Sequence, residues 1–148
     1  MLSNFTFRVQ GIPVPQGSLK AYKTHLTHSN RDILYSWRAD VALAAKRALP
    51  EGWDKSVPVS LRCEFVFPRP KYHYGTGGNA NKLKDSAPEH HVKTPDLDKL
   101  LRSVGDSLAD ACGCVVLNND NQIVSVHASK RYATDDFIGA IITVTALE

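Results

Sequence analysis

Residues 94–102 read Thr-Pro-Asp-Leu-Asp-Lys-Leu-Leu-Arg, residues 105–108 read Gly-Asp-Ser-Leu, and residues 118–123 read Asn-Asn-Asp-Asn-Gln-Ile. Apolar residues recur here at intervals of three and four, which predicts an amphipathic helix that a later glycine ends. The adjacent asparagines then predict a tight turn between two strands, 115–117 and 123–132. This part of the chain is therefore expected to form a helix, a turn and a returning strand.

Five charged residues of this unit are candidates for chemistry. Asp98, Arg102 and Asp106 are spaced by four and share one stripe of the predicted helix. The proline before Asp96 disfavours helix at the residue that precedes it, so we expect the helix to begin near Asp98 as its N-cap. Asp120 follows the turn, so it could meet Asp96 and Asp98 at one end of the sheet.

Carboxylate oxygens are the ligands that hard divalent cations such as Mg²⁺ prefer, together with water and phosphate. The segment therefore predicts metal-dependent phosphodiester chemistry, in which two metals about 4 Å apart could activate a water and stabilise the leaving oxygen. A structural alternative stays open at this point. An aspartate at a helix start is commonly a cap, Asp98 with Arg102 is a common ion pair, and Asn-Asn-Asp is ordinary turn chemistry.

The other elements predict an α+β fold in a single domain, residues 1–148. Alternating apolar residues indicate half-buried strands, and a spacing of three and four indicates a second helix before Pro50. A mixed sheet with two helices packed on it follows from this order. Beyond the unit at 94–132, the expected elements are strand 5–9, a helix from 29 or 30 to 48, strand 57–67 and strand 137–147.

Composition narrows the class of protein. A chain of 148 residues with 43% hydrophobic residues can bury one core, and it has no apolar run near the ~20 residues that a membrane span needs. The N-terminal residues lack the order of a secretion signal, so we expect an intracellular, cytoplasmic protein. Its three cysteines lack a disulfide or zinc pattern, and its net charge of +3 alone does not identify a nucleic-acid-binding protein.

The distribution of charge is more informative than its total. Acids are concentrated between Asp96 and Asp120, while basic residues lie largely in expected loops and element ends. An acidic pocket surrounded by basic loops suits a phosphate held by cations with lysines along the DNA backbone. We expect a flexible, substrate-side loop at 68–94. The candidate DNA-binding residues are Lys20, Lys23, Lys71, Lys82, Lys84, Lys93, Lys99, Lys130 and Arg131.

The three quoted strings resemble the signature of the RusA family of Holliday-junction resolvases, whose usual form is Pro-Asp-x-Asp-Asn-Leu-x-Lys, then Asp-Ala-Leu, then Asp-Asp-x-Gln-Ile. Residues 11–20 are also similar to the early segment of phage-type members, which suggests a phage or prophage setting. The resemblance implies a RusA-like fold and a homodimeric, Mg²⁺-dependent endonuclease that nicks four-way DNA junctions, with Mn²⁺ as the alternative metal. It implies metal binding by Asp96, Asp98 and Asp120, with Asp106 as a further family acid.

Three positions depart from the family pattern. Arg102 stands where the family has an essential lysine, and its planar guanidinium can clamp a phosphate but is no simple proton donor. Asn119 replaces the first of two aspartates, and Lys99 replaces an asparagine. Two rivals to an active enzyme therefore remain: a branched-DNA-binding dimer with weakened turnover, and a purely structural dimer whose acids cap and pair.

Overall fold

A four-stranded mixed sheet forms one layer of the molecule. The computed structural model describes residues 3–17, 28–109 and 116–147. The strand order is β1-β4-β2-β3, with β1 antiparallel to β4, β4 antiparallel to β2, and β2 parallel to the edge strand β3. The strand bounds are β1 Asn4–Gln10, β2 Val59–Phe67, β3 Ile123–Tyr132 and β4 Gly139–Ala146.

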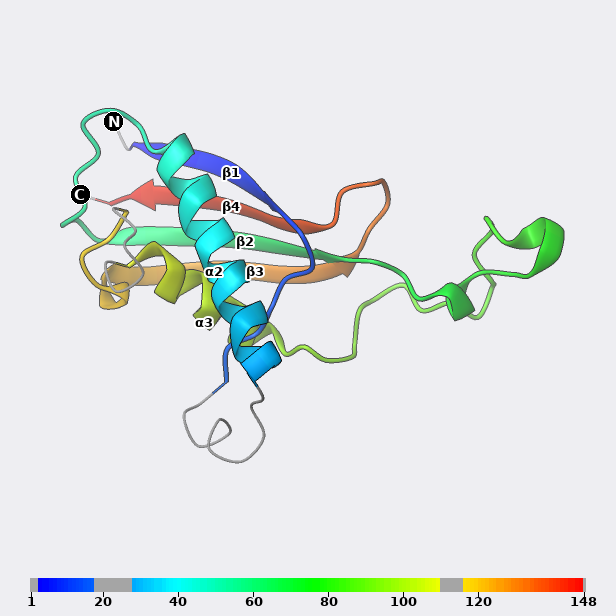
Figure 1. Cartoon of the computed structure of the whole chain (residues 1–148). Helices are drawn as coiled ribbons and strands as arrows, with labels where there is room; N and C mark the ends of the chain where they lie inside the picture. Colours follow the sequence, from blue (N-terminus) through cyan, green and yellow to red (C-terminus); the bar gives the residue numbers. More distant parts are fainter. Residues whose placement is uncertain (1–2, 18–27, 110–115, 148) are drawn as a thin grey trace.

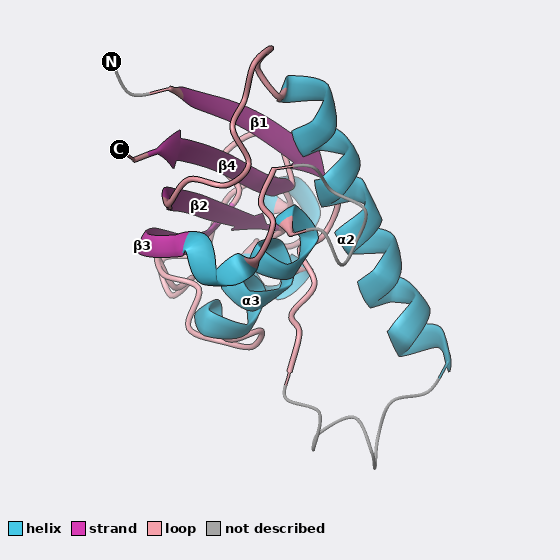
Figure 2. Cartoon of the chain, turned by 90° about the vertical axis from the view of Figure 1, so that its left-hand side faces the viewer, coloured by secondary structure: helices cyan, strands magenta, loops and turns pink. Residues whose placement is uncertain are grey.

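Two helices, α2 (His28–Ala48) and α3 (Leu97–Leu108), form the second layer. Figure 2 shows both on the same side of the sheet, with α2 beside β1 and α3 toward β3. This arrangement confirms the expected α+β fold with two helices on a mixed sheet. Among the described residues, no helix is long and apolar enough to cross a membrane.

The core lies between these layers because each element turns one apolar face toward the other layer. In β1, Phe5, Phe7 and Val9 are buried while the residues between them are exposed. Helix α2 contributes Trp37 and Val41 at a spacing of four, as the sequence pattern predicted. Leu100, Val104 and Leu108 are the fully buried apolar side chains of α3, so this helix packs tightly on the sheet.

One glycine permits the close approach of β4 to β1. Gly139 has φ 156°, and a Cβ atom there would lie 1.9 Å from the carbonyl oxygen of Val9.

Strand β3 has one extra residue where it pairs with β2. Val59 is opposite Ile123, but the next pair is Ser60 with Ser125, so β3 carries a β-bulge.

Residues 68–94 extend away from the sheet (Figure 1). The segment contains two short 3₁₀ helices, η1 (Lys71–His73) and η2 (Gly77–Asn79), and a bridge between Tyr74 and Leu83. It therefore has local hydrogen-bonded structure, and its expected flexibility stays a prediction.

The prediction of a strand at 115–117 was wrong for the part of this stretch that the structure describes. Leu117 makes only an isolated parallel bridge to Ala109, because its backbone N–H donates to the carbonyl of Leu108 at the end of α3. The turn that follows is the 3₁₀ helix η4 (Asp120–Gln122), so no hairpin forms. Residues 110–115, which include the expected glycine stop, lie outside the described residues.

Candidate active site

The N-cap of helix α3 lies two residues earlier than expected. This residue is Asp96, with extended backbone angles of φ −72° and ψ 142° and no side-chain cap hydrogen bond. Asp98 lies inside the first turn, so its predicted role as N-cap was wrong. The carboxylate of Asp96 instead accepts from the ammonium of Lys99 at 3.1 Å, and both side chains are about half exposed.

A pocket of about 270 Å³ lies between α3 and β3. Asp98 and Arg102 line it from one turn of the helix to the next, and Asp120 lines it from η4. Its apolar lining consists of Leu61, Leu101, Ile123 and Val126. The helix spacing of Asp98 and Arg102, together with the position of η4, therefore brings three of the five predicted site residues to one hollow.

Asp106 lies on the next turn of α3 and contacts Asp120. A hydrogen bond with Asp106, then burial, then the negative charge of Asp106 raise the pKa of Asp120 above the usual aspartate value. Both residues also line an adjoining pocket of about 230 Å³ together with Arg38 and Asn119. Two carboxyl groups this close share a proton or need a cation between them.

Gln16 is a member of this site that the sequence patterns did not identify. Its side-chain amide donates to the Asp106 carboxylate, and its backbone N–H donates to the carbonyl of Lys99 at 3.0 Å. The segment after β1 is thereby fixed along α3. The Oε1 atom of Gln16 is buried and has no hydrogen-bond partner in the described structure. The similarity of residues 11–20 to the early segment of phage-type members marked this part of the chain, but no pattern in it indicated this contact.

The loop that delivers Asp120 is held by a capping box. The Asn119 side chain accepts from the backbone N–H of Asn121, and Gln122 Oε1 accepts from the N–H groups of Asn118 and Asn119 at 2.9 Å. The Gln122 amide also donates to the carbonyls of residues 55 and 57. Asn and Asp are equally good caps, so the departure at Asn119 preserves this turn.

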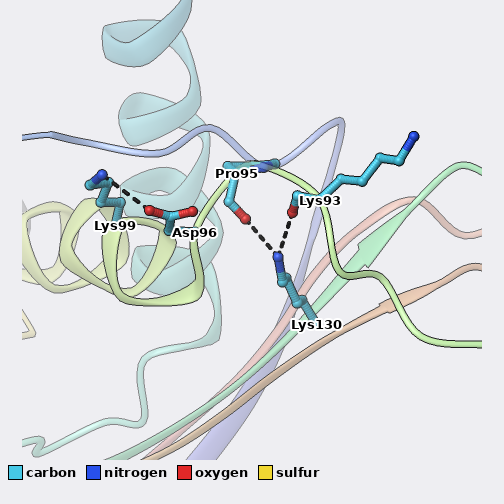
Figure 3. Close-up of polar contacts among 5 residues, drawn as sticks. All are labelled: Lys93, Pro95, Asp96, Lys99 and Lys130. Atoms are coloured by element: carbon cyan, nitrogen blue, oxygen red, sulfur yellow. Dashed lines mark hydrogen bonds and ion pairs between the residues drawn. The ribbon is translucent and has the colours of Figure 1, made fainter.

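Lys130 reaches from β3 to the turn before α3. Its ammonium donates to the carbonyl of Lys93 at 2.6 Å and to that of Pro95 at 2.9 Å, on either side of the cis bond between Thr94 and Pro95. Figure 3 shows this contact beside the Asp96–Lys99 pair. The lysine thus connects the sheet to the residues that place Asp96.

The other predicted DNA-binding residues are dispersed. Arg131 forms an ion pair with Glu64 at 2.7 Å, and Lys93 donates to the Tyr72 hydroxyl at 2.8 Å. Lys20 and Lys23 lie outside the described residues. The exposed Lys71, Lys82 and Lys84 are on the segment that extends from the sheet. DNA contact by these residues stays a prediction.

The donor set suits a hard divalent cation, although the three predicted ligands are not equally close. Asp98, Asp106 and Asp120 line two adjoining hollows, and carboxylate oxygens are the ligands that such a cation prefers. Asp96 lines a different pocket. In the described ranges, no three His, Cys, Asp or Glu side chains are arranged to hold a metal ion, so metal binding by these aspartates stays a prediction.

Comparison with known proteins identifies the family. The profile of the endodeoxyribonuclease RusA family matches residues 10–145, which is nearly the whole chain. No curated protein matches the sequence. The family match covers both helices, the bulged edge strand and every predicted site residue. The chain therefore belongs to the RusA family of endodeoxyribonucleases.

Proposed function

We propose that this protein resolves Holliday junctions or related branched DNA by paired, Mg²⁺-dependent phosphodiester hydrolysis, with Mn²⁺ as the alternative metal. The observation that carries the proposal is the Asp106–Asp120 carboxyl pair, which adjoins the pocket of Asp98 and Arg102. Two negatively charged carboxylates in such close contact repel each other unless a proton or a cation lies between them. Membership of an endodeoxyribonuclease family supplies the reaction class.

Asp98, Asp106 and Asp120 would hold the cation, with Asp96 as the ligand that the family resemblance adds. When bound, a divalent cation activates a water molecule and stabilises the leaving oxygen of the displaced phosphodiester. Arg102 lines the same pocket as Asp98 and is exposed, so its guanidinium would clamp the phosphate through two donors. Gln16 would orient the Asp106 carboxylate toward the site.

A homodimer suits this substrate because a four-way junction has approximate two-fold symmetry and clean resolution needs two symmetry-related nicks. An isologous dimer presents the same site twice. The exposed lysines of the 68–94 segment would follow the phosphate backbone outside the catalytic pocket.

One observation favours a second candidate, a branched-DNA binder with weakened turnover. Asp96 is paired with Lys99 and lines a pocket that contains neither Asp98 nor Asp120. A cation would then have fewer carboxylates than the family pattern implies. The two candidates make different predictions for nicking but the same prediction for binding.

The test is a labelled four-way junction and a linear duplex of the same sequence, incubated with Mg²⁺ or with chelator. Symmetric Mg²⁺-dependent nicking of the junction, lost in Asp98→Asn and kept in the control Asp85→Asn, supports the nuclease. Tight junction binding without nicking supports the binder. Equal binding of junction and duplex, without nicking of either, refutes both.

A further inference from the structure

A pocket of about 670 Å³ opens beside Asp96 and shares no lining residue with the pocket of Asp98, Arg102 and Asp120. Its volume is within the roughly 300–1,000 Å³ that is typical of sites for small molecules. Residues 12–15, the end of β2, residues 91–96 and the end of β3 surround it. The proposed hydrolysis uses none of its walls except Asp96.

The walls are largely apolar and aromatic. The rings of Phe67 and His91 lie 4.6 Å apart, and those of His91 and Tyr132 lie 4.9 Å apart. The guanidinium of Arg69 covers the Tyr132 ring at 4.5 Å, and five prolines complete the lining. The rings pack on one another and proline has a fixed φ, so few torsions of these walls would have to be ordered when a ligand binds.

His91 supplies a polar atom in this wall. It is 9% exposed, and its Nδ1 is buried without a hydrogen-bond partner in the described structure. A buried polar atom without a partner is costly unless a ligand or water can satisfy it. An occupant with both a flat apolar surface and hydrogen-bonding atoms would therefore fit better than a purely apolar one.

The rim of the pocket is positively charged. Lys93 and Lys99 line it and are exposed. Among the described residues of the lining, Asp96 alone is acidic, and its carboxylate is paired with Lys99. Such a rim above an apolar floor is complementary to a nucleotide, which joins a flat ring system to an anionic phosphate.

We propose that this pocket binds one unstacked nucleotide of the branched DNA, next to the phosphate that is cleaved. The proposal rests on the proposed function and adds the part of the substrate that the site selects. A base within a duplex is stacked on both faces and cannot enter the pocket, whereas a branch point offers bases that are easily unstacked. The pocket would thus favour branched DNA over linear duplex.

Ile12→Glu tests the proposal. Ile12 lines the pocket and is 62% exposed, so the change adds a carboxylate at the rim with little effect on packing. The control is Ile33→Glu, because Ile33 is 54% exposed on α2 and does not line this pocket. Junctions carry 2-aminopurine at nucleotides next to the branch, and binding is measured in chelator, where no nicking occurs.

Wild type and Ile33→Glu should change the 2-aminopurine fluorescence at one position, and Ile12→Glu should lose that change. Ile12→Glu should also bind junctions about tenfold more weakly, since stacking of one base contributes on that scale, while duplex binding is unaffected. Equal behaviour of both variants, in a protein that still nicks junctions, overturns this proposal alone. An altered oligomeric state of Ile12→Glu in sedimentation also overturns it, because the pocket would then hold a second copy of the chain. A wild type without junction binding or nicking refutes the proposed function itself.

Discussion

The lysine that connects β3 to the turn before α3 is expected to affect both stability and metal response. Lys130→Met removes the two donors that reach the carbonyls of Lys93 and Pro95 at 2.6 and 2.9 Å. A protected hydrogen bond to a charged group contributes about 1.5–3 kcal/mol. Lys93 is exposed and Pro95 half-buried, so water can replace much of this hydrogen bonding in the variant. We therefore expect the free energy of unfolding to fall by about 1–2 kcal/mol in total.

For a domain of this size, that loss corresponds to a Tm lower by about 2–8 °C in calorimetry. The Mg²⁺ concentration for half-maximal nicking should also rise several-fold, because the freed turn places Asp96 less well. Lys130→Arg keeps the charge and donors and should recover part of both effects. Lys46→Met, a change at an exposed lysine of α2 outside the predicted DNA-binding set, is the matched control. If Lys130→Met and Lys46→Met have the same Tm and Mg²⁺ response, the reasoning is wrong.

Three further predictions concern pH, metal and backbone packing. Burial, and next the charge of Lys130, lower the pKa of His91, so its contribution to stability is complete above the usual histidine pKa of about 6.5 and is lost as pH falls through the folded value. In urea unfolding, the free energy of unfolding should therefore fall less between pH 7 and pH 5 in His91→Phe than in wild type; an equal fall in both proteins would contradict this assignment. Mg²⁺ at about 100 times its dissociation constant should stabilise the wild type by about 2.7 kcal/mol in thermal melts, and Asp120→Asn should lose this gain; a shift that survives the substitution would place the metal elsewhere. Gly139→Ala should cost at least about 2 kcal/mol in urea unfolding because its Cβ meets the Val9 carbonyl, whereas Gly78→Ala, with nothing within 4 Å, should be near neutral; similar values for the two would refute the steric argument.

Periodicity predicted the elements that bury a continuous apolar face. The alternation of Phe5, Phe7 and Val9 and the helical spacing around Leu100 are satisfied only when those faces meet in a core, so these elements were confirmed with small shifts at their ends. The short stretch 115–117 lacked that constraint. A turn residue such as Asn119 can serve a hairpin or a 3₁₀ cap equally well, and the side-chain amide of Gln122 selected the second.

The candidate site was only partly accessible to sequence reasoning. A spacing of four placed Asp98 and Arg102 on one pocket because it follows from helix geometry alone. The contacts of Gln16 with Asp106 and of Lys130 with the turn before α3 join residues 90 and 35 positions apart. Such contacts depend on how the elements pack, and no local pattern records them.

The single extra residue in β3 determines which basic side chain faces α3. Along β2, Val59 and Leu61 are two residues apart on the core side, but their partners Ile123 and Val126 are three apart. At this point the alternation of side chains between the two faces of β3 shifts by one residue. As a result, Ala128, Lys130 and Tyr132 lie on the core side. If Val124 were instead paired opposite Ser60, without a bulge, Arg131 would lie on the core side and Lys130 on the opposite surface. The orientation of Lys130 thus depends on the bulge, and one residue inserted or deleted between Ser125 and Lys130 would turn Lys130 away from the helix even where every side chain of the site is retained.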